Sequence, residues 1–158
     1  MDKSEVDLGR RKALKAGGGI GLFGLLVAAG FIQPGIASAA SERAAFEAKS
    51  MDEALHALGV NFPENNSAVQ LAAPEIAENG AVVPVTVEST LSRTEQICIL
   101  VDKNPTMLAA NFLVPEGTEG FITTRIKMAQ TSSVIALVKA NGKFYRASRE
   151  VKVTAGGC

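Results

Sequence analysis

The sequence predicts an all-β protein: an immunoglobulin-like β-sandwich with a short N-terminal helix and a flexible C-terminal arm. Its 158 residues, 47% of them hydrophobic, suit one domain with one core. After Pro63, short apolar segments alternate with turn residues almost to the end of the chain. Two glycines then precede the last residue, which is typical of a mobile tail.

The helix is predicted just before the strands. Ser50-Met51-Asp52-Glu53 has the form of a capping box, and the apolar residues that follow recur with helical spacing until Gly59. The helix could also begin earlier, because residues 41–49 are rich in helix-forming residues.

The strands are predicted from alternating or continuous apolar residues between turn signals, and Asn141-Gly142 is typical of a tight hairpin turn. Six or seven strands within about 90 residues favour a sandwich over a closed barrel. The expected strands are 81–89, 97–101, 110–114, 121–128, 133–140 and 143–147, with Val151 and Val153 marking a last one.

Residues 1–39 have the pattern of a twin-arginine signal peptide. Arg10 and Arg11 lie in a basic cluster, an uncharged run follows from Gly19 to Ile32, and Ala37-Ser38-Ala39 is a small-residue cleavage pattern. The run is shorter than the ~20 residues that span a bilayer. The sequence thus predicts export to the periplasm, with a general secretory signal or an uncleaved anchor as the alternative. Residues 40–65 would then form a helical segment, 66–153 the sandwich and 154–158 the arm.

Composition argues against several classes of function. The formal net charge is zero, whereas nucleic-acid binding needs a basic excess, so no nucleic-acid partner is expected. After cleavage of the signal peptide, no association with the membrane is expected either. His56 is the only histidine, and it is expected on the polar face of the helix. Phosphate loops, paired carboxylates and cysteine or histidine metal motifs are lacking in the sequence. We therefore predict a non-enzymatic protein without a metal or other cofactor.

The two cysteines differ in their surroundings. Cys98 lies within an apolar strand, where a thiol is usually buried and inert. Cys158 is the last residue and follows Gly156 and Gly157, so five residues of arm could carry its thiol roughly 17 Å. A Cys98–Cys158 disulfide is the alternative, because the cysteine count is even in a protein predicted to be exported.

Four stretches and the terminal Gly-Gly-Cys resemble the SoxY family, the substrate-carrying subunits of the periplasmic sulfur-oxidising (Sox) system. The stretches are Ile76 to Val85, Val101 to Pro105, Thr124 to Ser132 and Val151 to Cys158. Many members of this family end Gly-Gly-Cys-Gly-Gly, whereas this sequence ends at Cys158.

The resemblance implies a non-enzymatic carrier that holds thiosulfate-derived sulfur on Cys158, including persulfide states, at the end of a swinging arm containing Gly156 and Gly157. It implies a heterodimer with a second sandwich protein, SoxZ. It also implies transient contacts with the SoxAX cytochrome, the SoxB hydrolase and an enzyme that oxidises or accepts the remaining sulfane sulfur.

Two other classes of function remain open at this point. A periplasmic protein could use the thiol of Cys158 to bind a metal or to exchange disulfides, although further ligands are sparse. The chain could instead be a structural interaction domain that is stabilised by a disulfide between the two cysteines.

Overall fold

The computed structural model describes residues 36–157. The predicted signal features from Arg10 and Arg11 to Ile32 lie outside the described residues, as does Cys158, whereas the predicted cleavage pattern Ala37-Ser38-Ala39 falls within a helix that spans Ile36–Glu47. Within the described part of the chain, no helix is long and apolar enough to cross a membrane.

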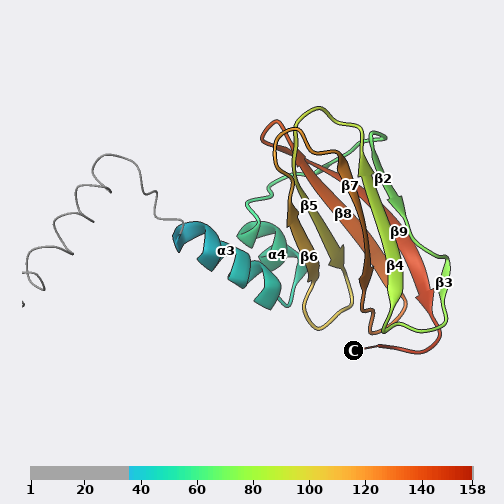
Figure 1. The fold of residues 1–158 in the computed structure, drawn as a ribbon. Coiled ribbons are helices and arrows are strands. Elements are labelled where there is room, and N and C mark those ends of the chain that lie inside the picture. Colours follow the sequence, from blue (N-terminus) through green and yellow to red (C-terminus); the bar gives the residue numbers. More distant parts are fainter. Residues whose placement is uncertain (1–35, 158) are drawn as a thin grey trace, which may run out of the picture. The chain divides into compact units, whose positions relative to one another are not determined.

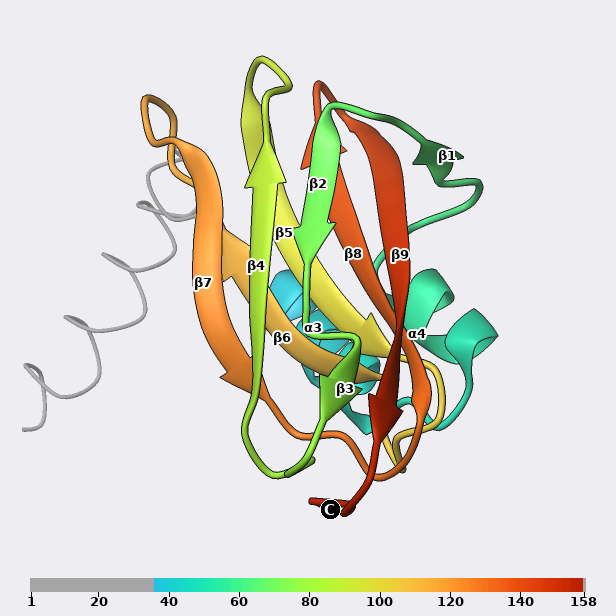
Figure 2. The ribbon, with the colours of Figure 1, turned by 90° about the vertical axis from the view of Figure 1, so that its right-hand side faces the viewer.

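Two sheets pack face to face, which confirms the predicted β-sandwich (Figures 1 and 2). The larger sheet has the order β1-β9-β8-β5-β6 with β3 also paired to β9, and the smaller has the order β2-β4-β7. The strands are β1 (Glu64–Asn65), β2 (Val69–Ala72), β3 (Ile76–Ala77), β4 (Val83–Ser89), β5 (Thr94–Val101), β6 (Leu108–Leu113), β7 (Gly120–Ile126), β8 (Ser132–Ala140) and β9 (Lys143–Val153).

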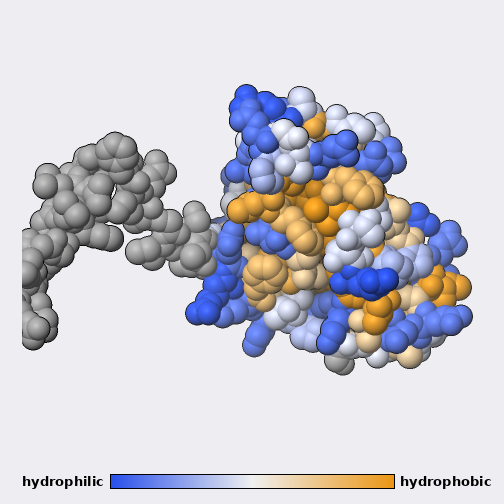
Figure 3. All heavy atoms as spheres, viewed as in Figure 1, coloured by the Kyte–Doolittle hydropathy of each residue, from blue (hydrophilic) through white to orange (hydrophobic). Residues whose placement is uncertain are grey.

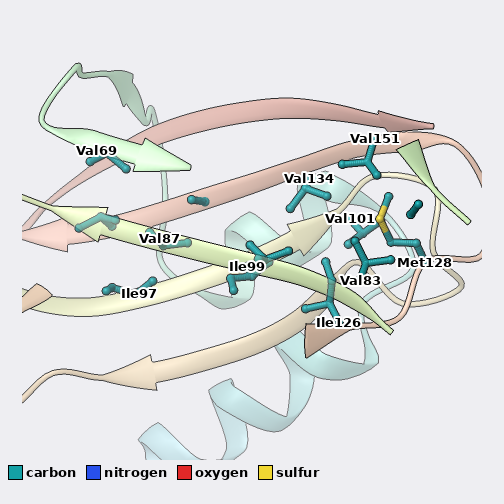
Figure 4. Close-up of a cluster of buried hydrophobic side chains, with 14 of the residues drawn as sticks. Val69, Val83, Val87, Ile97, Ile99, Val101, Ile126, Met128, Val134 and Val151 are labelled. Carbon is teal, nitrogen blue, oxygen red and sulfur yellow. The ribbon is translucent and has the colours of Figure 1, made fainter. Parts of the chain in front are cut away.

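The main core lies between the sheets and follows from the alternation read in the sequence. Val83, Val85 and Val87 on β4 are buried, and the intervening side chains point outward. Side chains from β5, β7, β8 and β9 meet them from the other directions, as Figure 4 shows for Ile99, Ile126, Val134 and Val151 among others.

A second, smaller core explains why β5 is apolar on both faces. Ile97, Ile99 and Val101 face the smaller sheet, whereas Cys98 and Leu100 pack beneath the helical segment on the other face. In the sequence, a strand that is buried on both faces appears as a continuous apolar run. The sequence identified β5 as interior and predicted the helix at residues 51–58, but it did not predict that helices bury the second face of this strand.

Two helices form this cover: α3 (Ile36–Glu47) and α4 (Met51–Ala57) (Figure 1). The Ser50 half of the predicted capping box is confirmed, because the amide of Glu53 donates to the Ser50 hydroxyl at 3.3 Å. The Glu53 carboxylate also accepts from the Lys49 amide at 3.0 Å. Residues 41–47 therefore belong to a separate helix, and not to an early start of α4 as the sequence allowed.

The C-terminal strands need a second correction. Asn141 and Gly142 both have positive φ, at 50° and 73°, and join β8 to β9 as predicted. However, 143–147 and 151–153 belong to one strand, β9, which pairs with β8 along its length. The polar residues Ser148, Arg149 and Glu150 hid this continuity, because they interrupt the apolar pattern while their backbone stays in the ladder.

Candidate functional site

The predicted arm begins where β9 ends, and β3 holds its first residue. β3 pairs in parallel with β9, with Ile76 opposite Lys152 and Ala77 opposite Val153. One residue farther on, the amide of Thr154 donates to the carbonyl of Ala77 at 3.1 Å. Strand pairing thus continues one residue past β9 and fixes the direction in which the arm leaves the sheet.

The rest of the arm, residues 155–157, lies against two turns that we call the arm cradle, namely residues 79–81 and 128–129. The amide of Gly80 donates to the carbonyl of Ala155 at 2.7 Å. The amide of Gly157 donates to the carbonyl of Met128 at 3.0 Å, and the amide of Met128 donates to the carbonyl of Gly80 at 2.7 Å. The arm that the sequence predicted to be flexible is therefore hydrogen-bonded to the sandwich as far as Gly157.

The close approach of backbone to backbone requires glycine on both sides of this contact. A Cβ added to Gly156 would overlap the carbonyl oxygen of Ala129, and one added to Gly157 would overlap the backbone of Ala81. A Cβ on Gly80, which is buried, would overlap the carbonyl oxygen of Met128. These glycines fit because they have no side chain, a reason different from the flexibility that the sequence suggested.

Side chains from neighbouring loops hold the cradle in place. Asn104 bridges the turn after β7, because its Nδ2 donates to the carbonyl of Lys127 at 2.8 Å and its Oδ1 accepts from the amide of Ala129 at 2.9 Å. The hydroxyl of Thr131 accepts from the amide of Val153 at 2.9 Å, directly before the arm. The carboxylate of Asp102 accepts from the amide of Ser133 at 2.8 Å. Such bonds restrict a turn that has no ladder of its own.

The structure thus brings together parts of the chain that are far apart in sequence. The turn between β3 and β4, the loop after β5, the turn between β7 and β8 and the end of β9 meet at one end of the sandwich, near the C-terminus in Figure 2. These are the four stretches on which the resemblance to the SoxY family rests.

Comparison with known proteins agrees with this geometry. The family model of the sulfur oxidation protein SoxY matches residues 55–158. The chain belongs to the SoxY family. The structure of the sulfur carrier protein SoxY from Chlorobium limicola f thiosulfatophilum is similar, with 40% sequence identity and a TM-score of 0.60 over 66% of this chain and 96% of that one.

Other comparisons add nothing to the SoxY assignment. No curated protein matches the chain. A second solved structure, which concerns T cell specificity and activation by the bacterial superantigen toxic shock syndrome toxin-1, contains a chain that shares 11% sequence identity with this one. The TM-score is 0.39, over 54% of this chain and 98% of that one. Likeness at that level supports no argument about fold or function.

Cys98 has the environment of a structural thiol in this SoxY-family chain. It is free, fully buried beneath the helices, and its Sγ donates to Oδ1 of Asn111 at 3.3 Å. Burial raises its pKa from 9.0 to about 12, with the Glu42 charge adding to the rise and a hydrogen bond from Gln96 opposing it. Because the thiolate is the reactive form, Cys98 is a poor nucleophile at neutral pH.

The remaining candidate residues are placed as follows. His56 is exposed on α4, as predicted, and packs into no core. The side chains of residues 41–157 include no group of three or more potential metal ligands. Gly156 and Gly157 lie in the arm cradle, and Cys158 is attached directly after them. Sequence reasoning missed Gly80 and Asn104 as parts of the site, although both lie within stretches that carry the family resemblance.

Proposed function

We propose that this chain is a non-enzymatic sulfur carrier whose Cys158 thiol holds thiosulfate-derived intermediates covalently. The observation that carries the proposal is the terminal Gly-Gly-Cys of a SoxY-family chain. The similar Chlorobium protein is itself described as a sulfur carrier. The other cysteine, Cys98, is buried with a raised pKa and is unsuited to this role.

The proposed chemistry begins with oxidative loading. The Cys158 thiol and thiosulfate form a sulfur–sulfur bond, giving cysteine S-thiosulfonate, one proton and two electrons, and the electrons pass to the SoxAX cytochrome. Water then attacks the sulfonate sulfur in the SoxB hydrolase, which releases sulfate and two protons and leaves a deprotonated persulfide on Cys158. A further enzyme oxidises or accepts this sulfane sulfur. The carrier supplies only the thiol, because the oxidant and the hydrolytic groups belong to its partners.

We further propose that the working form is a heterodimer with SoxZ, and its interface is supported by the open side of the sandwich. β6 and β7 are the last strands of their sheets, with no further partner strand among the described residues. Leu113 on β6 is 69% exposed and Phe121 on β7 is 51% exposed. Figure 3 shows hydrophobic residues gathered over these two strands. Exposed apolar edges of this kind are normally covered by a partner.

The family and the N-terminal sequence both support a place of action outside the cytoplasm. We propose export to the periplasm by the twin-arginine route, guided by Arg10 and Arg11. A protein exported in the folded state would carry its sandwich and arm to the compartment already assembled.

Intact-mass spectrometry tests the carrier role. The protein is purified from thiosulfate-grown cells as wild type, as Cys158→Ser and as the matched control Cys98→Ser. Wild type and Cys98→Ser are expected to carry sulfur adducts that a thiol reductant removes, and Cys158→Ser none. Adducts that persist in Cys158→Ser, or a wild-type protein that never carries one, would contradict the proposal.

A further inference from the structure

The arm of this chain occupies a fitted site on its own sandwich. We infer that residues 155–157 alternate between a docked and a released state, and that the turn at Gly80 is a latch that holds the arm back until a partner releases it. The inference that the arm docks rests only on the described contacts. The inference that docking regulates the carrier also rests on the proposed role of Cys158.

Steric fit is the first support for the latch. Gly156 lies against the carbonyl of Ala129, Gly157 against the backbone of Ala81, and Gly80 against the carbonyl of Met128, each too close for a Cβ. A tail resting loosely on a surface would leave room for a methyl group at some of these positions. None of the three leaves such room, so the arm and the cradle are complementary in shape.

The hydrogen bonds around Gly80 form a connected set, which is the second support. Gly80 donates to Ala155 and accepts from Met128, and Met128 in turn accepts from Gly157. Each of the two arm bonds therefore lies beside a bond within the cradle. Moving Gly80 would weaken both arm bonds together, as expected of a latch that opens as one unit.

The docked arm is held by few contacts and can therefore be released. Among the described residues, two main-chain hydrogen bonds hold residues 155–157, and both Ala155 and Gly156 are exposed to solvent. Water can replace such bonds readily, so elements held this way belong to the least stable part of a fold.

Release changes how far the thiol can travel. With Gly157 docked, the Cα of Cys158 stays within about 3.8 Å of the Gly157 Cα, because only one peptide unit separates them. With residues 155–157 released and Thr154 still bonded to Ala77, the four residues from 155 to 158 extend to roughly 13 Å. The latch thus decides whether the carrier cysteine remains beside the sandwich or enters the active site of a second protein.

Nitrogen-15 relaxation of the full-length chain tests the latch, with Gly80→Ala as the opening variant and Ala155→Ser as the matched control at an exposed arm position. In wild type and Ala155→Ser, the amides of Gly156 and Gly157 should have order parameters near the ~0.85 of rigid backbone. In Gly80→Ala they should fall below about 0.6, while the values for β4, β5 and β8 stay unchanged.

Should Gly80→Ala perturb the sandwich, Gly156→Ala opens the latch from the arm side and leaves the cradle sequence intact. Order parameters below about 0.6 at Gly156 and Gly157 in wild type, or values that stay high in a folded opening variant, would overturn the inference. These outcomes do not depend on sulfur loading. A rigid wild-type arm in a protein that never carries adducts would therefore support the latch while refuting the carrier role.

Discussion

Asn104 holds Ala129 in place through a hydrogen bond of 2.9 Å between its side-chain oxygen and the Ala129 amide. The two residues come from loops at opposite sheets, since Asn104 follows β5 of the larger sheet and Ala129 follows β7 of the smaller. The carbonyl of Ala129 is also the atom that leaves no room for a side chain at Gly156. Asn104 therefore positions the arm cradle, because the side-chain bonds that it makes to described residues go to Lys127 and Ala129 and not to the arm.

Replacing Asn104 by alanine should lower the free energy of unfolding by about 1–3 kcal/mol, because two main-chain groups lose their partner. Asn104→Asp keeps the acceptor for Ala129 but loses the donor to Lys127, so its cost should be intermediate. Urea unfolding measures these effects. The control Lys103→Ala, at an exposed neighbouring position, should change stability by less than about 0.5 kcal/mol. Equal stability of wild type and Asn104→Ala would contradict the positioning role.

Cys98→Ser should lower stability only modestly, by about 1 kcal/mol, and should leave sulfur loading intact. The loss is small because Oδ1 of Asn111, which accepts from the Cys98 thiol at 3.3 Å, remains as a partner for the serine hydroxyl. Cys158→Ser should not change the melting temperature, because this cysteine follows two glycines beyond the last strand, where a side chain contributes little packing. Thermal unfolding of both variants checks this, and a loss of several kcal/mol in Cys158→Ser would favour the disulfide alternative.

Stability should fall at alkaline pH through Cys98. Its folded pKa of about 12 lies above the ordinary value of 9.0, so above pH 9 the unfolded chain loses this proton while the folded protein keeps it. The contribution of the neutral thiol is thus complete below pH 9 and declines by about 1.4 kcal/mol per pH unit toward pH 12. Measuring the free energy of unfolding of wild type and Cys98→Ala between pH 7 and 11 isolates the contribution of the Cys98 thiol. A stability difference independent of pH would rule out the raised pKa.

Export should depend on the arginine pair. Replacing Arg10 and Arg11 together by lysine keeps the charge of the region but removes the pair that a twin-arginine signal requires. We expect the protein to accumulate inside the cell, as measured by immunoblotting of periplasmic and cytoplasmic fractions. Unchanged periplasmic protein would favour the general secretory signal. Replacing Lys12 and Lys15 by arginine is the charge-matched control and should leave export unchanged.

Partner binding should depend on the exposed edge of β6 and β7. Leu113→Ser or Phe121→Ser should weaken the complex with SoxZ at least tenfold, because central apolar side chains dominate the affinity of such interfaces. Phe62→Ser is the matched control, since Phe62 is 91% exposed but lies outside these strands. Titration calorimetry of the purified pair measures the affinities. A greater loss with Phe62→Ser would place the interface elsewhere.

Local signals in the sequence sufficed for much of the fold. The alternation of Val83, Val85 and Val87 predicted a half-buried strand, and Asn141-Gly142 predicted the hairpin, because side-chain period and turn geometry are properties of short segments. The short strands β2 and β3 were not predicted. Their two to four residues carry too few alternating positions for a pattern, and they exist because β4 and β9 offer partners.

The sequence by itself determined that Gly-Gly-Cys follows the last strand, that a helix precedes the strands and that Cys98 lies in an apolar strand. Only the tertiary structure decided that Cys98 faces the helices, and that Gly80, Asn104 and Ala129 meet beside Gly156 and Gly157. The reason is physical: a residue's local pattern sets its strand and its face, whereas contacts between residues 25 to 77 positions apart depend on how the two sheets stack and where their loops come together.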